Sequence, residues 1–240
     1  MFKCKQEQYM NTNPTLEALS TSERSDAQLV LYELGKDVVT NARSEYFDID
    51  VEADGKAGYG SMLALGGVSL SGSVFYREIR PDSNLFIPRQ RAFCESIGLE
   101  RDRLLDEGDD LHAVISDFND WVNDESGGNP AVLTALNASF DGPWVDLSEL
   151  KTGRTNPFGD ASYCIKSLAM AFGLLHLPKE LDPPEFPYEW KQTTKSRLPQ
   201  LIVPERTFTH KADEDSVWQQ ELHFMEVGLL SLVGSNLNLR

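Results

Sequence analysis

The sequence is poor in cysteine, in long apolar runs and in positive charge. Its three cysteines, Cys4, Cys94 and Cys164, are far apart and form no C-x-x-C pair. We therefore expect neither a disulfide framework nor a zinc site, and a reducing, cytoplasmic setting is favoured. We assign none of the three a catalytic role. Cys164 lies in an apolar stretch that reads as helical, so we expect it to be a small core residue.

No run of about 18 apolar residues is present, so we expect no membrane span. The N-terminal residues MFKCKQEQYMNTNPT lack the apolar segment of a signal peptide. With 22 Lys and Arg against 38 Asp and Glu, the formal net charge is −16, which disfavours a protein that coats nucleic acid by bulk attraction. An enzyme that holds a few nucleotides locally stays open, because cations bound to clustered carboxylates invert the local charge.

A chain of 240 residues, 40% hydrophobic and 25% charged, has the size and composition of one large domain, alone or with appendages. Residues 1–43 are polar and read as an N-terminal appendage. Residues 26–39 could form a short helix there, although the region could equally be a partly disordered tail. Residues 44–240 form the main domain, interrupted at about 178–207 by a proline-rich insert that cannot be helical throughout. The later part of this segment is locally basic, with Lys191, Lys195, Arg197, Arg206 and Lys211.

The main domain opens with a predicted strand at 46–52. Apolar Phe47, Ile49 and Val51 alternate with acidic residues, which is the period of a strand with one apolar face. The acids share the other face, about 7 Å apart at every second residue. A turn at 53–55 and strands at 61–70 and 73–79 complete a predicted antiparallel meander.

Helices and one more strand are predicted beyond the meander. A helix over 111–122, capped by Asp109 or Asp110, precedes a short buried strand at 131–136. Further helices are predicted from the apolar spacing of Ile165, Leu168, Ala169 and Phe172, and from about 213 to 230, where Trp218, Leu222, Met225 and Leu229 share a stripe. The alternation predicts an α/β fold with a mixed sheet.

Five residues scattered along the chain could form one metal-dependent site: Asp50, Glu52, Asp141, His210 and Asp215. Such a set can hold two divalent cations and deprotonate a water beside them. Each member also has a simpler explanation. The acids of the first strand could form a solvated face, and Asp141 could form an Asx turn or cap a helix. Asp215 could interact with a helix dipole, and His210 could be a surface residue without a catalytic role.

The strand acids favour the metal site, because Asp48, Asp50 and Glu52 on one face repel one another unless cations lie between them. Asp48, Asp213 and Glu214 need no metal to be explained. We expect the remaining histidines, His112, His176 and His223, to be structural or surface residues.

Taken together, the segments resemble the three motifs of the DEDDh (DnaQ-like) 3′–5′ exonucleases, a family of the RNase H-like superfamily. D-x-E before a glycine-containing turn matches Asp50-Val51-Glu52, H-N-A-x-F-D matches Leu136 to Asp141, and H-x-x-x-x-D matches His210 to Asp215. The resemblance runs from about Tyr46 to Leu230. It departs at Leu136, where many relatives have histidine, which puts substrate contacts in doubt but not catalysis.

The resemblance implies an RNase H-like mixed sheet, with a three-stranded antiparallel meander plus parallel strands flanked by helices, and places the exonuclease domain at 44–240. It implies two Mg²⁺ or Mn²⁺ ions per site, held by Asp50, Glu52, Asp141 and Asp215, with His210 as general base. The implied partner is the 3′ end of single-stranded DNA or RNA, and the implied product a nucleoside 5′-monophosphate. Relatives are often dimers, which leaves a homodimer open.

Substrate contacts are predicted from nearness to the motifs and from charge, at Met62, Leu63, Asn137, Phe140, Lys191, Lys195 and Arg197. Met62, Leu63 and Phe140 could equally be core residues. Two other functions stay open. One is a catalytically idle RNase H-like domain that binds nucleic acid or a protein partner. The other is a metalloenzyme acting on a small phosphodiester such as a dinucleotide.

Overall fold

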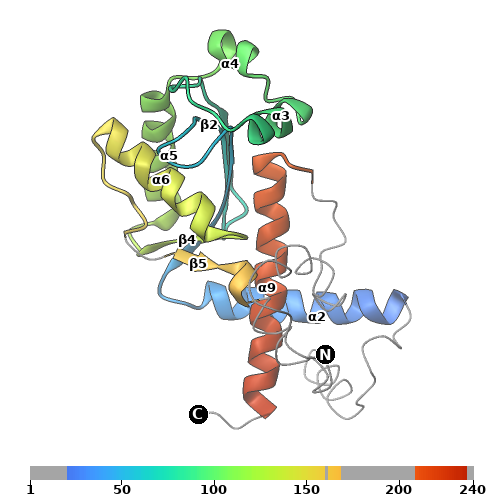
Figure 1. Ribbon diagram of the computed structural model, residues 1–240. Helices are drawn as coiled ribbons and strands as arrows, with labels where there is room; N and C mark the ends of the chain where they lie inside the picture. Colours follow the sequence, from blue (N-terminus) through green and yellow to red (C-terminus); the bar gives the residue numbers. More distant parts are fainter. Residues whose placement is uncertain (1–20, 160–161, 169–208, 237–240) are drawn as a thin grey trace. The chain divides into compact units, whose positions relative to one another are not determined.

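The computed structural model describes residues 21–159, 162–168 and 209–236 (Figure 1). The chain divides into two compact units. The sheet unit comprises Ala42–Lys166 and Arg206–Gln220, and the helical unit comprises Met1–Asn41, Ser167–Glu205 and Glu221–Arg240. Within the described ranges, no helix is both long and apolar enough to cross a bilayer.

The sheet unit is built on a five-stranded mixed sheet of order β3-β2-β1-β4-β5. Strands β1 (Glu45–Ala53), β2 (Met62–Ser69) and β3 (Val74–Glu78) form an antiparallel meander. Strand β4 (Ala131–Ala135) runs parallel to β1, and β5 (Ser162–Cys164) runs parallel to β4. The predicted mixed sheet, with its meander and parallel strands, is confirmed.

In the part of the chain that the structure describes, five helices accompany the sheet. They are α3 (Pro88–Ser96), α4 (Arg101–Glu107), α5 (Leu111–Ser126), α6 (Ala138–Thr152) and the first part of α9 (Ala212–Asn236). Helix α5 begins as predicted, because Asp110 accepts hydrogen bonds from the backbone N–H groups of His112 and Ala113. Helices α5 and α6 lie side by side on one face of the sheet (Figure 1).

The main core fills the space between the sheet and helices α5 and α6. Phe47, Ile49 and Val51 point into it from β1 and meet Phe118 of α5 and Trp144 of α6. Phe47 and Phe118 are fully buried, and each such side chain contributes about 1.5–3 kcal/mol to folding. The alternation of the first strand therefore assigns its apolar face correctly, and its acids face the other side of the sheet.

Of the elements that the structure describes, three helices and one strand were not predicted. Helices α3 and α4 carry little apolar periodicity, and α6 contains Gly142 and Pro143, a pair typical of a turn. Cys164, expected in a helix, lies instead in β5 and packs partly buried against the main core. A strand of three residues depends on its pairing with β4, so local periodicity cannot reveal it. Helical residues do begin at Ile165, but Ala169 and Phe172 lie outside the described residues.

The helical unit contains α2 (Thr21–Thr40) and the second part of α9, from Glu221 onward. The predicted helix at 26–39 is confirmed and is longer than expected. Two glycines let the helices approach closely: a Cβ on Gly35 would lie 1.7 Å from the Phe224 carbonyl oxygen, and one on Gly228 would lie 2.1 Å from that of Leu31. Beside this contact the Tyr32 and Phe224 rings meet edge to face.

Candidate active site

Strand β1 places Asp50 and Glu52 on one face of the sheet, two residues apart. Their partners on β2 are Gly66 and Ala64. This face is not solvated, since Asp48 is fully buried and Glu52 is only 9% exposed. Asp48 accepts a hydrogen bond of 2.6 Å from the Thr134 hydroxyl of β4. The explanation of these acids as a solvated strand face is therefore wrong.

The start of α9 lies directly over this acidic face. A Cβ on Gly66 would come within 2.2 Å of the Ala212 carbonyl carbon, so only glycine permits the helix to pack so closely on β2. About two turns further along, Gln219 donates a hydrogen bond of 2.7 Å from Nε2 to Asp50 Oδ1. Its Oε1 accepts from the Leu136 N–H at 2.8 Å. Gln219 thus joins α9 to Asp50 and to the end of β4.

Asp215 organises the turn that leads into α9. It is fully buried, and its two oxygens accept hydrogen bonds from the backbone N–H groups of Thr209, at 2.8 Å, and His210, at 2.9 Å. His210 has a φ of 62°, unusual for a residue with a side chain. These two hydrogen bonds hold that conformation. Nδ1 of His210 lies 4.0 Å from Asp215 Oδ2, and its ring meets the edge of Phe93 of α3 at 4.9 Å between centroids.

Asp141 reaches the site from the first turn of α6, where its charge complements the helix dipole. It is 3% exposed, and its Oδ1 accepts a hydrogen bond of 3.0 Å from the backbone N–H of Val51. Pairing of β1 with β4 extends only to Asp48, which leaves the Val51 N–H available for this contact. Asp141 is therefore fixed to β1 between Asp50 and Glu52.

Burial raises the pKa of three of these carboxyl groups, and repulsion from neighbouring carboxylates adds to the shift in Glu52 and Asp141. Burial, with added repulsion from Asp50 and Asp215, raises the pKa of Glu52 to about 9. Burial and the Asp50 charge raise the pKa of Asp141 well above its ordinary value. The pKa of Asp215 is also raised by burial, although the hydrogen bonds from Thr209 and the charge of His210 oppose the shift. The site therefore favours a positive charge among the carboxylates.

A divalent cation fits this arrangement. Among the described residues, Glu52, His210 and Asp215 offer ligand atoms that all lie within 4.8 Å of one another. Carboxylate oxygens without a thiolate are the ligands that suit Mg²⁺ and Mn²⁺.

The predicted substrate contacts have different environments. Met62 and Leu63 are buried, and Phe140 is half-buried against the main core. Asn137 is exposed at the N-terminal end of α6, where its Oδ1 accepts from the Ser139 hydroxyl at 3.0 Å. Their contact with substrate stays a prediction. Lys191, Lys195 and Arg197 lie outside the described residues.

Among the described residues that touch the site, Gln219 and Phe93 were missed by sequence reasoning. Gln219 could have been found, because it lies one helical turn after Asp215 and so shares its face of α9. No sequence pattern pointed to Phe93, because α3 itself was not predicted. The contact of Phe93 with His210 also joins residues more than 100 positions apart.

No protein-family model matches the chain. A curated relative, the 3′-5′ DNA exonuclease Cap18 of Escherichia coli, is 31% identical over 185 residues, a match that covers 74% of this chain and 88% of that protein. Among solved structures, the nuclease domain of 3′hExo, a DEDDh family member, bound to rAMP, matches with a TM-score of 0.53. That match has 15% identity and covers 78% of this chain and 92% of the other.

The structural likeness assigns the RNase H-like nuclease fold. Together with the sequence relative, it shows that the chain belongs to the DEDDh-type 3′–5′ exonucleases. This family uses divalent metal ions, in agreement with the ligand group of Glu52, His210 and Asp215.

Proposed function

We propose that this chain hydrolyses the terminal phosphodiester bond at the 3′ end of single-stranded nucleic acid and releases nucleoside 5′-monophosphates one at a time. The observation that carries the proposal is the convergence of Asp50, Glu52, Asp141, His210 and Asp215 from β1, α6 and the start of α9. DNA is the favoured substrate, because the relative with 31% identity is named a DNA exonuclease. RNA stays open.

Asp50, Glu52 and Asp215 would hold the Mg²⁺ or Mn²⁺ ions, with Asp141 acting directly or through water. Bound there, two cations would stabilise negative charge on the phosphate and on the leaving 3′ oxygen. Burial of Glu52 and Asp215 supports this assignment, because their raised pKa values make bare carboxylates unfavourable.

His210 would act as general base. Its side chain is 41% exposed, so water can reach it, and the Asp215 hydrogen bonds fix its backbone. The imidazole takes a proton from the attacking water, the water oxygen bonds to phosphorus, and the bond from phosphorus to the 3′ oxygen breaks. The released nucleotide then carries a 5′ phosphate.

Substrate binding is proposed on the residues around this centre. Asn137 and Phe140 are at least partly exposed at the start of α6 and could contact the terminal nucleotide. Met62 and Leu63 are buried, so they would support the site from within unless the structure rearranges. Lys191, Lys195 and Arg197 would hold upstream phosphates.

A 5′-labelled oligonucleotide assay tests the proposal. Single-stranded DNA, RNA and a dinucleotide are incubated with Mg²⁺ or Mn²⁺, and the products are resolved at single-nucleotide steps. A ladder shortening from the 3′ end with wild type and none with Asp50→Ala is expected. If none of the three substrates is cleaved with any divalent metal, the proposed exonuclease activity is contradicted. That result would favour a catalytically inactive domain that binds nucleic acid or a protein partner. Cleavage of the dinucleotide alone would favour the small-phosphodiester enzyme.

A further inference from the structure

The sheet alone does not fix the end of β1 where Glu52 lies. The antiparallel register with β2 shifts between Glu52 and Ala53, and the pairing with β4 stops at Asp48. A register shift of this kind bends a strand and interrupts its ladder of hydrogen bonds. Glu52 therefore needs support from outside the sheet to keep its carboxylate beside Asp215 and His210.

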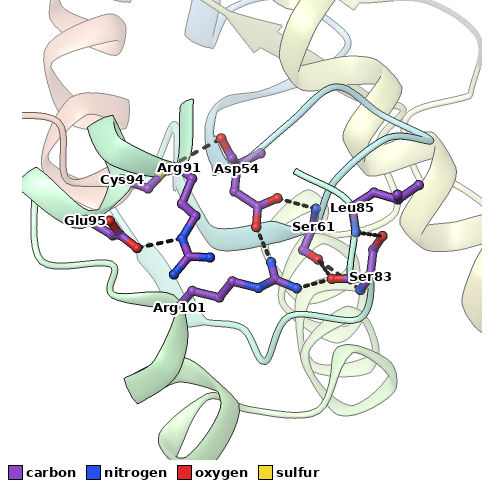
Figure 2. Close-up of polar contacts among 9 residues, drawn as sticks. Asp54, Ser61, Ser83, Leu85, Arg91, Cys94, Glu95 and Arg101 are labelled. Atoms are coloured by element: carbon purple, nitrogen blue, oxygen red, sulfur yellow. Dashed lines mark hydrogen bonds and ion pairs between the residues drawn. The ribbon is translucent and has the colours of Figure 1, made fainter. Parts of the chain in front are cut away.

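A buried ion pair lies two residues beyond Glu52. Asp54 is fully buried and pairs with Arg101 of α4, whose side chain is 7% exposed (Figure 2). The other carboxylate oxygen of Asp54 accepts a hydrogen bond of 2.6 Å from the Ser61 N–H, and Arg101 also donates to the Ser83 carbonyl. The Ser83 N–H donates to the Ser61 hydroxyl at 3.1 Å. The four residues thus form a closed polar network (Figure 2).

The backbone around this pair is held as well. The Asp54 carbonyl accepts a hydrogen bond of 2.8 Å from the Ile87 N–H, at the start of α3, and its N–H donates to the Ser61 carbonyl at 3.1 Å. The Ala53 carbonyl accepts from the Cys94 thiol of α3 at 3.4 Å. The two peptide units after Glu52 are therefore joined to α3 and to the segment before β2.

Stability alone is a weak explanation for such a pair, because desolvation of two buried charges offsets most of their attraction. The planar guanidinium of Arg101, bound to the Asp54 carboxylate and the Ser83 carbonyl, is better suited to fixing the position of the backbone at Asp54. In enzymes generally, a displacement of about 1 Å at a catalytic group can cost about 100-fold in rate.

We infer that Asp54 and Arg101 are positioning residues that hold the end of β1 so that Glu52 faces Asp215 and His210. The inference rests on the proposed function, since it assumes that Glu52 binds a metal ion. Neither residue touches the reacting atoms. The pair acts through the backbone of Ala53 and Asp54.

The test compares Arg101→Gln with Arg103→Gln, a matched substitution two residues further along the same helix. Arg103 pairs with Glu78 at 2.7 Å in a half-exposed position and has no contact with the Asp54 network in the described interactions. Mn²⁺ affinity is measured by titration calorimetry, without substrate, and kcat and KM are measured on single-stranded DNA. Circular dichroism and thermal melting show whether each variant is folded.

Arg101→Gln is expected to weaken Mn²⁺ binding and to lower kcat by about 10-fold or more each, with KM for DNA within about 3-fold of wild type. Arg103→Gln should match wild type in all three quantities. Arg101→Lys keeps the buried charge but loses the planar guanidinium that binds two acceptors at once. This variant should fold and show intermediate losses in Mn²⁺ affinity and kcat.

A folded Arg101→Lys enzyme with wild-type Mn²⁺ affinity and kcat would overturn the inference, as would equal losses in Arg101→Gln and Arg103→Gln. A wild-type protein that neither binds Mn²⁺ nor cleaves DNA or RNA would instead overturn the proposed function. The two failures are therefore distinguishable.

Discussion

At the scale of single residues, the side chains of Asp48, Asp50 and Glu52 project from the same face of β1 but have different surroundings. Asp48 is hydrogen-bonded to Thr134 of the neighbouring strand, and Asp50 to Gln219 of α9. Glu52 is the residue whose pKa rises to about 9, through burial and the charges of Asp50 and Asp215. The same alternation thus gives one acid that is hydrogen-bonded within the sheet, Asp48, and two acids of the proposed metal site, Asp50 and Glu52.

The raised pKa of Glu52 predicts how stability depends on pH without metal. In the folded protein Glu52 keeps its proton up to about pH 9, whereas the unfolded chain loses it near 4.3. Stability in EDTA should therefore fall as pH rises between these values. Glu52→Gln removes this dependence, so its stability relative to wild type should grow by at least about 1 kcal/mol between pH 5 and 8.5.

Urea unfolding at the two pH values measures this difference. Glu107→Gln, an exposed carboxylate of α4, is the control and should keep a constant offset from wild type. The same constant offset in Glu52→Gln would contradict the assigned environment of Glu52.

His210 makes a separate prediction about catalysis. Its loss should lower kcat by about 10² to 10⁴-fold, the range for removal of a general base, and should leave the fold intact because the side chain is partly exposed. His210→Ala is compared with His112→Ala, an exposed histidine of α5, at neutral pH. Full activity in His210→Ala would show that another group takes the proton.

At the scale of elements, the contact between β2 and α9 decides whether Asp215 reaches Asp50 and Glu52. Gly66 lies opposite Asp50, and its missing side chain leaves room for the Ala212 backbone. The clash of a Cβ here is with backbone atoms, so it cannot be relieved by a side-chain rotation. The position of the first turn of α9 depends on this glycine.

Gly66→Ala should therefore move the start of α9, lower kcat by about 10-fold or more and destabilise the protein by about 1–3 kcal/mol. Gly142→Ala is the matched control, since among the described residues the nearest atom that its Cβ would meet is the Ser162 hydroxyl, at 3.9 Å. Because alanine favours a helix more than glycine does, this variant should be stabilised by up to about 1 kcal/mol. Kinetic assays and thermal melting check both, and an active, stable Gly66→Ala would contradict the close packing.

The sequence could predict the elements whose local pattern agrees with their environment. The alternation from Phe47 to Glu52 assigned β1 and its two faces, and the spacing from Leu111 to Val122 assigned α5. It could not reveal β5, whose stability comes from pairing with β4, nor α6, where Gly142 and Pro143 suggest a turn. The five residues of the proposed site were identified by resemblance, but the hydrogen bonds that some of them form with Gln219, Val51 and Thr209 become visible only in the folded structure.

At the scale of the whole molecule, a net charge of −16 opposes both the folded state and the approach of a nucleic acid. Cations bound at the proposed site would offset the charge among its buried carboxylates. Metal binding should therefore stabilise the protein as well as enable catalysis, because ions bind the folded state and not the unfolded chain.

Addition of Mn²⁺ at 100 times its dissociation constant should stabilise the wild type by about 2.7 kcal/mol. The melting temperature should rise accordingly, and EDTA should reverse the change. Asp215→Asn should lose most of the rise, whereas Asp117→Asn, an exposed acid of α5, should retain it. Thermal melting across a Mn²⁺ series measures the effect, and an equal rise in both variants would indicate non-specific binding.

The central claim is that five residues, and not their acidic neighbours, form one metal-dependent nuclease site. The most direct test compares Asp50→Asn with Asp48→Asn, acids two residues apart on the same face of β1, in a single-turnover cleavage assay with Mn²⁺. We predict that Asp50→Asn loses about 10³-fold or more in rate, while Asp48→Asn, whose amide can still accept the Thr134 hydrogen bond, stays within about 3-fold of wild type. Equal losses in the two folded variants, or activity retained in Asp50→Asn, would contradict the account.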